Sequence, residues 1–389
     1  MANRTPGRRV EAAVAPASPS QAPLRRLFTT AALAAVVIAS IPAVAEARPV
    51  KAIWGPHQFH AGHAECGGGG PCSAFPVYRQ LGVDVYQFQI QWDDVAPTRP
   101  ANPRNPADPA YDWPSSVDSI VAQARAHRIG LAALVKGTPA WANGGRSSAW
   151  APGKPRLFAD FMFAASRRYP TIRKWMIWGE PTRRDNFLPQ GRRGVRRYAR
   201  MLDAAFGALK RARRSNVVIG GMTLNGGDKI KTPRFLKLLR LPNGKPPRMN
   251  LYGHNPFDRR FPNIRKQPIR DFRGLPDVDT LWREVSRAYQ RRNGRWARKR
   301  SQRPRKLWLA EWLVQSDHDS DIFDWHVSRK KQAVYLRAGY RLARRAKYVK
   351  ALGWFRLDDE PNSATSAAWG LMTYSGARKP AFKAYRFLP

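Results

Sequence analysis

Two glutamates each stand directly after a short apolar segment that contains tryptophan. Glu180 follows residues 175–178 and Gly179, and Glu311 follows residues 307–310. Hydrolysis of a glycosidic bond requires such a pair, because one carboxyl group must donate a proton to the leaving oxygen while the other, ionised, attacks or activates water. Two close carboxylates divide these roles readily, since the charge of one raises the pKa of the other. The sequence therefore predicts acid/base chemistry at these two positions.

The elements that position these glutamates form a repeating pattern of apolar runs and helical periodicities. Apolar residues recur at i, i+3, i+4 and i+7 between the runs, which predicts helices that cover a sheet. This alternation predicts an α/β fold with a single (β/α)₈ TIM barrel, whose chemistry lies at the carboxyl ends of the strands. An open doubly wound sheet is the alternative, although no G-x-G-x-x-G follows the first strand. The predicted strands cover residues 52–54, 83–90, 131–135, 175–178, 217–220, 250–253, 307–310 and 352–355.

Aromatic and polar side chains near the predicted strand ends are candidates for binding a sugar. Aromatic faces stack on sugar rings, although packing in the core is the alternative for each tryptophan. Four ligands at metal spacing are not visible, so the sequence predicts no metal site and no cofactor. The candidate substrate-binding residues are Trp92, Trp141, His254, Asn255, Trp312 and Trp354.

Over nearly all of residues 50–389, the sequence resembles the retaining glycoside hydrolases of clan A, particularly the family 39-like and family 5-like barrels. Trp-Gly-Glu-Pro resembles the Trp-Asn-Glu-Pro motif of their acid/base, which corresponds to Glu180. Leu-Ala-Glu-Trp resembles their Thr-Glu-Phe motif, which corresponds to the nucleophile at Glu311. Residues 138–142 and 369–381 resemble the third-strand end and the closing segment. The resemblance implies a poly- or oligosaccharide substrate and two glutamates about 5 Å apart, the retaining separation.

Three positions depart from the pattern of that clan. Gly179 stands where an Asn usually binds the sugar 2-hydroxyl, Gln87 where an Arg often supports the nucleophile, and Phe257 where a Tyr often hydrogen-bonds it. Each change removes a polar contact, so the site uses replacements such as His254, Asn255 or Gln89, or it is slow or inactive. A non-catalytic barrel that binds carbohydrate or cell wall is therefore the alternative function.

The formal net charge of +42, from 69 Lys and Arg against 27 Asp and Glu, favours polyanionic partners, and basic residues that only cover a solvated surface are the alternative. No basic nucleic-acid motif is present, so nucleic acid is not expected as a partner. Basic residues after the fourth and sixth strands predict a positive barrel mouth and an anionic glycan, with a neutral glycan and outward-pointing side chains as the alternative. The oligomeric state stays open. These basic residues are Arg183, Arg184, Arg259, Arg260, Arg265, Lys266, Arg270 and Arg273.

Residues 1–47 have the order of a secretory signal peptide, which leaves residues 48–389 as the barrel domain. Arg25 and Arg26 precede an apolar run from Ala31 to Ile41, and small residues follow at 43, 45 and 47. The segment Arg-Arg-Leu-Phe resembles the twin-arginine export pattern. The run is short for a membrane span, so we expect a secreted protein without stable membrane insertion, and an uncleaved anchor is the alternative.

The two cysteines, Cys66 and Cys72, enclose a loop of four glycines and a proline. An exported chain meets an oxidising compartment, so this spacing predicts a local disulfide. Two free thiols are the alternative.

Overall fold

The structure is a computed structural model that describes residues 48–55, 59–61, 71–226, 228–258, 264–266, 269–360 and 365–388. The predicted signal peptide, residues 1–47, lies outside these ranges, and the described residues belong to one compact unit. Within these ranges, no helix is long and apolar enough to cross a membrane.

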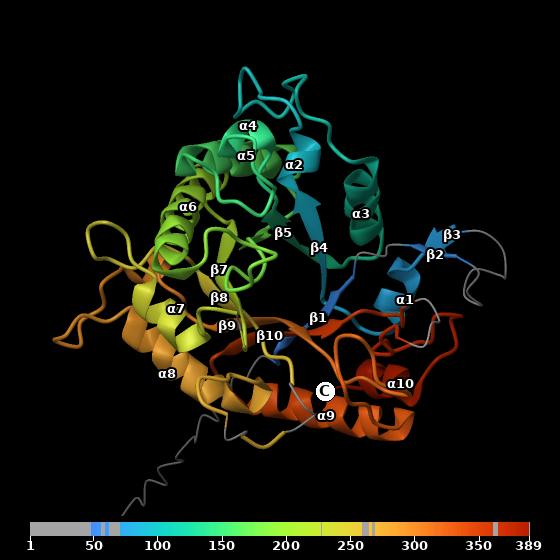
Figure 1. Ribbon diagram of the computed structural model, residues 1–389. Coiled ribbons are helices and arrows are strands. Elements are labelled where there is room, and N and C mark those ends of the chain that lie inside the picture. The colour runs from blue at the N-terminus through green and yellow to red at the C-terminus, as the bar shows by residue number, and fades with distance from the viewer. Residues whose placement is uncertain are drawn as a thin grey trace, which may run out of the picture. The chain divides into compact units, whose positions relative to one another are not determined.

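Eight parallel strands close into a barrel, in which β1 pairs with both β4 and β10 (Figure 1). All eight predicted strands are present within a few residues of their expected bounds. The closed ring confirms the (β/α)₈ barrel and excludes the open sheet. The barrel strands are β1 (Val50–Trp54), β4 (Val85–Gln91), β5 (Gly130–Lys136), β6 (Lys174–Ile177), β7 (Val217–Leu224), β8 (Leu251–Asn255), β9 (Leu307–Trp312) and β10 (Val349–Phe355).

Helices form a layer around the barrel (Figure 1). Their amphipathic spacing explains this layer: the apolar stripe of α6 from Tyr198 to Leu209 is buried, while arginines occupy its outer face. The helices are α1 (Phe75–Gln80), α2 (Trp92–Val95), α3 (Ser115–Ala126), α4 (Ala140–Asn143), α5 (Pro155–Arg168), α6 (Gly191–Ala212), α7 (Thr232–Leu238), α8 (Val278–Ala288), α9 (Arg329–Arg345) and α10 (Pro380–Arg386), with 3₁₀ turns at Leu275–Asp277 and Arg300–Gln302.

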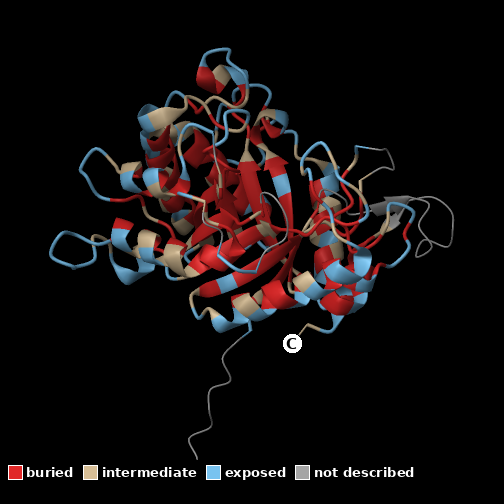
Figure 2. Cartoon of the chain, turned by 60° about the horizontal axis from the view of Figure 1, so that its bottom comes forward, coloured by how far each residue is buried: buried red, intermediate tan, exposed pale blue. Residues whose placement is uncertain are grey.

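Two apolar clusters hold the layers together. The inner one fills the barrel with side chains such as Ala132 and Leu134 of β5 and Trp308 and Ala310 of β9. The larger one lies between strands and helices. Figure 2 shows the buried residues concentrated on the strands and on the helix faces toward them. This packing leaves the strand ends as the places where polar side chains gather.

A short antiparallel hairpin, β2 (Phe59–Ala61) with β3 (Pro71–Ser73), was not predicted from the sequence. It flanks the glycine-rich loop. Cys66 lies outside the described residues, so the disulfide with Cys72 stays a prediction.

Gly353 of β10 is a position where the barrel leaves no room for a side chain. A Cβ atom there would lie 2.1 Å from the backbone oxygen of Ala310 and 2.5 Å from Gln87 Nε2. We expect Gly353→Ala to lower the free energy of unfolding by about 1–3 kcal/mol, because strand β9 would have to move. The measurement is urea denaturation of both proteins.

Gly207→Ala in α6 is the matched control for this prediction. The nearest atoms to its Cβ would be two guanidinium nitrogens at 3.4 Å, which is ordinary contact. Helix propensity then favours alanine by about 0.5–1 kcal/mol. Equal loss of stability in both variants would contradict the packing argument.

Candidate active site

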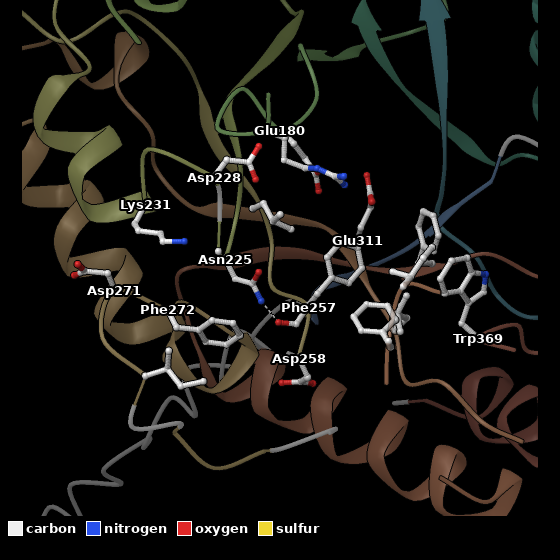
Figure 3. A pocket seen from close by; sticks show the side chains of 18 of the residues that line it. Glu180, Asn225, Asp228, Lys231, Phe257, Asp258, Asp271, Phe272, Glu311 and Trp369 are labelled. Atoms are coloured by element: carbon white, nitrogen blue, oxygen red, sulfur yellow. Dashed lines mark hydrogen bonds and ion pairs between the residues drawn. The ribbon is translucent and has the colours of Figure 1, made fainter. Parts of the chain in front are cut away.

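A cavity of about 540 Å³ opens at the carboxyl ends of the barrel strands, and both Glu180 and Glu311 line it. Its described walls come from the segments that follow β6, β7, β8, β9 and β10. Figure 3 shows Lys231 and Asp271 on one side of the cavity and Trp369 on the other. The remaining residues of this wall are Arg183, Leu224, Asn225, Gly226, Asp228, Phe257, Asp258, Ile269, Arg270, Phe272, Leu313, Ile322, Phe323 and Phe355.

The carboxylate of Glu180 is buried and hydrogen-bonded at both oxygens. Asn255 donates from Nδ2 to Oε1 at 2.9 Å, and Asn186 donates from Nδ2 to Oε2 at 3.3 Å. Arg183 Nη1 lies 3.6 Å from Oε2. Asn255 was predicted as a site residue and the structure brings it to Glu180. Asn186 was not predicted, because no strand end or motif marks it.

The backbone around Glu180 is in an unusual conformation. Trp178 has a φ of 64° and Glu180 a φ of 44°, both in the left-handed region that non-glycine residues rarely adopt. Backbone hydrogen bonds hold them there, from Trp178 N to Val135 O and from Glu180 N to Met222 O, each at 2.9 Å. Such outliers cost of order 1–3 kcal/mol each and persist only where the surroundings enforce them.

The two glutamates influence each other electrostatically. Burial raises the pKa of Glu180, against the opposing effects of Asn255 and Arg183. Glu311 is half-buried at the cavity wall, and burial together with the charge of Glu180 raises its pKa well above the usual range. The pair therefore retains one proton at pH values where an ordinary carboxylic acid is ionised.

The raised pKa of Glu311 predicts how the stability of the protein depends on pH. Below pH 4.5 the Glu311 carboxyl is protonated in both folded and unfolded chains. As the pH rises above this value, the unfolded chain releases its proton first, so stability falls until the folded carboxyl also ionises. We expect Glu311→Gln to raise Tm, and to raise it more at pH 7 than at pH 4. Calorimetry at both pH values checks this, and an equal gain at both would contradict it.

The three departures have structural explanations. Gln87 is fully buried, donates to Ala310 O at 2.7 Å and accepts from Trp308 Nε1 at 2.7 Å. It thus fixes strand β9 just before Glu311, and neither of these two hydrogen bonds reaches that carboxylate. Phe257 forms an apolar wall against Phe323 and Phe355, with ring centroids at 6.2 and 6.1 Å.

Gly179 lies beside the barrel interior. A Cβ atom on it would come within 3.3 Å of Leu134 Cδ1, so an asparagine there would press on that side chain. The structure therefore fits glycine at this position better than the usual asparagine.

Three of the four tryptophans predicted to bind sugar are buried in the core. Trp312 faces outward and packs against Gly339 of α9, and Trp354 packs against Trp312 with centroids 5.6 Å apart. Trp92 packs among aromatic side chains that include Phe158 and Phe161. These three have no more than 1% of their surface exposed, so the expectation that they offer faces to a sugar is wrong.

Trp141 is half-buried and borders a second cavity of about 330 Å³, away from both glutamates. Its Nε1 donates to Ala96 O at 2.8 Å. The aromatic residues that do line the main cavity are Phe257, Phe272, Phe323, Phe355 and Trp369.

His254 is fully buried and does not line the cavity. Its Nε2 lies 2.7 Å from the carbonyl oxygen of Arg273, so this nitrogen carries the proton, and Nδ1 accepts from Thr223 Oγ1 at 2.8 Å. Burial lowers its pKa to about 4. The predicted role of His254 in sugar binding is thus replaced by a structural one.

No protein-family model matches the sequence, and no match is found among the curated proteins. Solved structures do match. A family 39 glycoside hydrolase from Bacteroides cellulosilyticus aligns with a TM-score of 0.59 at 15% identity, over 88% of this chain and 63% of that one. A glucosidase from Croceicoccus marinus gives 0.62 at 14%, over 88% and 67%. A monomeric beta-xylosidase from Caulobacter crescentus gives 0.56 at 18%, over 87% and 67%.

The chain has the fold of these glycoside hydrolases. It spans less than two thirds of the length of the first of them. The glycoside hydrolase fold agrees with the resemblance noted in the motifs around Glu180 and Glu311.

The charge around the barrel mouth is more balanced than expected. Lys266 pairs with Asp279 at 3.0 Å, and Arg273 with Glu284. Arg259 and Arg260 lie outside the described residues. Among the cavity residues, five carboxyl groups face three basic side chains, so this part of the mouth does not favour an anion. They are Glu180, Asp228, Asp258, Asp271 and Glu311 against Arg183, Lys231 and Arg270.

Proposed function

We propose that this protein is a retaining glycoside hydrolase that cleaves O-glycosidic bonds of a poly- or oligosaccharide. The observation that carries the proposal is the pair Glu180 and Glu311, which come from the fourth and seventh barrel strands and line one cavity. A cavity of about 540 Å³ is within the range of ligand pockets, and aromatic side chains line part of it.

In the proposed mechanism, Glu180 protonates the leaving oxygen while Glu311 attacks the anomeric carbon and forms a glycosyl ester. Water then attacks that carbon, Glu180 takes its proton, and the ester bond breaks. The raised pKa values supply the single proton that the first step needs. Because Asn255 and Asn186 favour the charged form of Glu180 in the free protein, sugar binding must shift this proton toward Glu180.

The test is a panel of polysaccharides and aryl glycosides, with the anomeric configuration of the first product followed by NMR. We expect cleavage of at least one substrate with retention of configuration. Inversion would contradict the role of Glu311 as nucleophile.

A non-catalytic carbohydrate-binding barrel is the second candidate. Its support is that the two described residues at the positions where the clan often has an Arg or a Tyr give Glu311 no such contact: Gln87 bonds to strand β9, and Phe257 has no side-chain polar group. Loss of one group that stabilises charge costs about 10²–10³ in rate. Sugar binding without cleavage of any substrate in the panel would favour this candidate.

Export is part of the proposal. Its support is the order of Arg25 and Arg26, the apolar run from 31 to 41 and the small residues that follow. Mass spectrometry of protein from the culture medium should show a chain that begins after residue 45 or 47, without free thiols at Cys66 and Cys72. A full-length, cell-associated chain would overturn it.

A further inference from the structure

The cavity occupies only part of the barrel mouth. None of its described wall residues follows β1, β4 or β5. Glu180 stands at the border between the cavity and the rest of the barrel mouth, because its strand β6 pairs with β5 on one side and with β7 on the other. A substrate that extends past Glu180 therefore meets the ends of β5 and β4.

The register of β5 directs Lys136 toward the axis of the barrel. Ala132 and Leu134 belong to the cluster that fills the barrel interior, and side chains of a strand alternate between its two faces. Lys136 is the next residue on that inner face and the last of the strand. Its register partner on β4 is Gln91.

Lys136 is connected to Glu180 by hydrogen bonds through the side chain of Asn186. Its Nζ donates to Asn186 Oδ1 at 3.4 Å, and Asn186 donates in turn to Glu180 Oε2 at 3.3 Å. Among the described residues, no carboxylate oxygen lies within 4.0 Å of this ammonium group. Lys136 is half-buried, and a partly desolvated cation without an ion-pair partner is costly.

We propose that Lys136 is a specificity-determining residue that binds an anionic oxygen group, such as the carboxylate of a uronic acid, on the β5 side of Glu180. The inference rests on the proposed function, because it names the class of sugar that the site takes. An ammonium group has three N–H donors, and Asn186 uses one of them. The rest are available to a ligand, whereas the basic residues of the main cavity are outnumbered by carboxyl groups.

Another explanation is that Lys136 only offsets the charge of the two glutamates. Its positive charge lowers the pKa of both Glu180 and Glu311. In that case its removal would affect neutral and anionic ligands alike. The two explanations are separated by comparing each uronate with its neutral sugar.

The experiment measures binding rather than turnover, so that it gives an answer even if no substrate is cleaved. NMR titrations of the full protein use three pairs: D-glucuronate and D-glucose, D-galacturonate and D-galactose, and D-mannuronate and D-mannose. The variants are Lys136→Met and Lys136→Arg. Lys154→Met is the matched control, because it removes one exposed positive charge from the segment after β5 and lies outside the cavity.

We expect one uronate to bind the wild type at least about tenfold more tightly than its neutral sugar, an advantage that declines with added salt. Lys136→Met should abolish this preference without changing the affinity for the neutral sugar, while Lys136→Arg and Lys154→Met keep it. The proposal is overturned if no uronate is preferred, if the preference survives in Lys136→Met, or if that variant loses both ligands equally. Cleavage of neutral glycosides by the wild type would leave the proposed function standing in each of these cases.

Discussion

Glu180→Gln and Glu311→Gln should each lose most of the hydrolytic turnover while the barrel stays folded. Glutamine keeps the size of the side chain but neither donates a carboxylic proton nor attacks an anomeric carbon. General acid–base catalysis contributes about 10²–10⁴ in rate, and we expect kcat to fall by at least this factor in both variants. The measurement is kcat with an aryl glycoside, with circular dichroism to check folding.

The leaving group distinguishes the two roles. A phenol of low pKa leaves without protonation, so Glu180→Gln should recover activity on such a substrate while Glu311→Gln should not. Asp185→Asn is the control, because this carboxylate lies in the same loop but its side chain is 81% exposed and outside the cavity. Turnover near that of the wild type in both glutamate variants would remove the assignment.

The second large effect is a loss of stability at acid pH, which we expect from the buried side chain of His254. Above pH 6.5 the imidazole is neutral in both folded and unfolded chains and contributes nothing to the pH dependence. Below this value the imidazole of His254 is protonated in the unfolded chain, whereas in the folded chain it stays neutral until about pH 4. The free energy of unfolding therefore falls as the pH falls through this window. At about 1.4 kcal/mol per pH unit, the loss reaches about 3 kcal/mol.

His254→Gln tests this prediction, since an amide donates to Arg273 O without titrating. Urea denaturation of wild type and variant at pH 7, 5.5 and 4 should show a difference in pH dependence between 6.5 and 4. Parallel curves for the two proteins would show that His254 does not titrate in this way.

The fold could be predicted from the sequence because the spacing of apolar residues differs between strands and helices, and all eight barrel strands carry apolar runs. The two glutamates could be predicted for a related reason, since each directly follows such a run. The tryptophans could not be placed in the same way. Trp312 follows Glu311 in the chain, but it packs against α9, whereas Glu311 lines the cavity.

Two side chains linked to Glu180, Asn186 directly and Lys136 through Asn186, show what pattern reading misses. Asn186 lies six residues beyond it in an irregular loop, where no period predicts the direction of a side chain. Lys136 did carry a signal: it continues the alternation of Ala132 and Leu134, but the predicted strand ended at Val135. Strand ends are hard to place because the last residue often pairs at its backbone while its side chain already faces solvent.

The left-handed backbone at Trp178 and Glu180 has a consequence for laboratory evolution. Glycine relieves such a conformation, so a library selected only for heat tolerance should enrich glycine at 180, where the exchange deletes the proposed proton donor. At 178 the exchange would also remove a fully buried ring, and that loss of about 3–5 kcal/mol outweighs the relief of strain. A screen for thermal stability alone would therefore select a stable barrel without activity. Selection for activity has to be applied together with selection for stability.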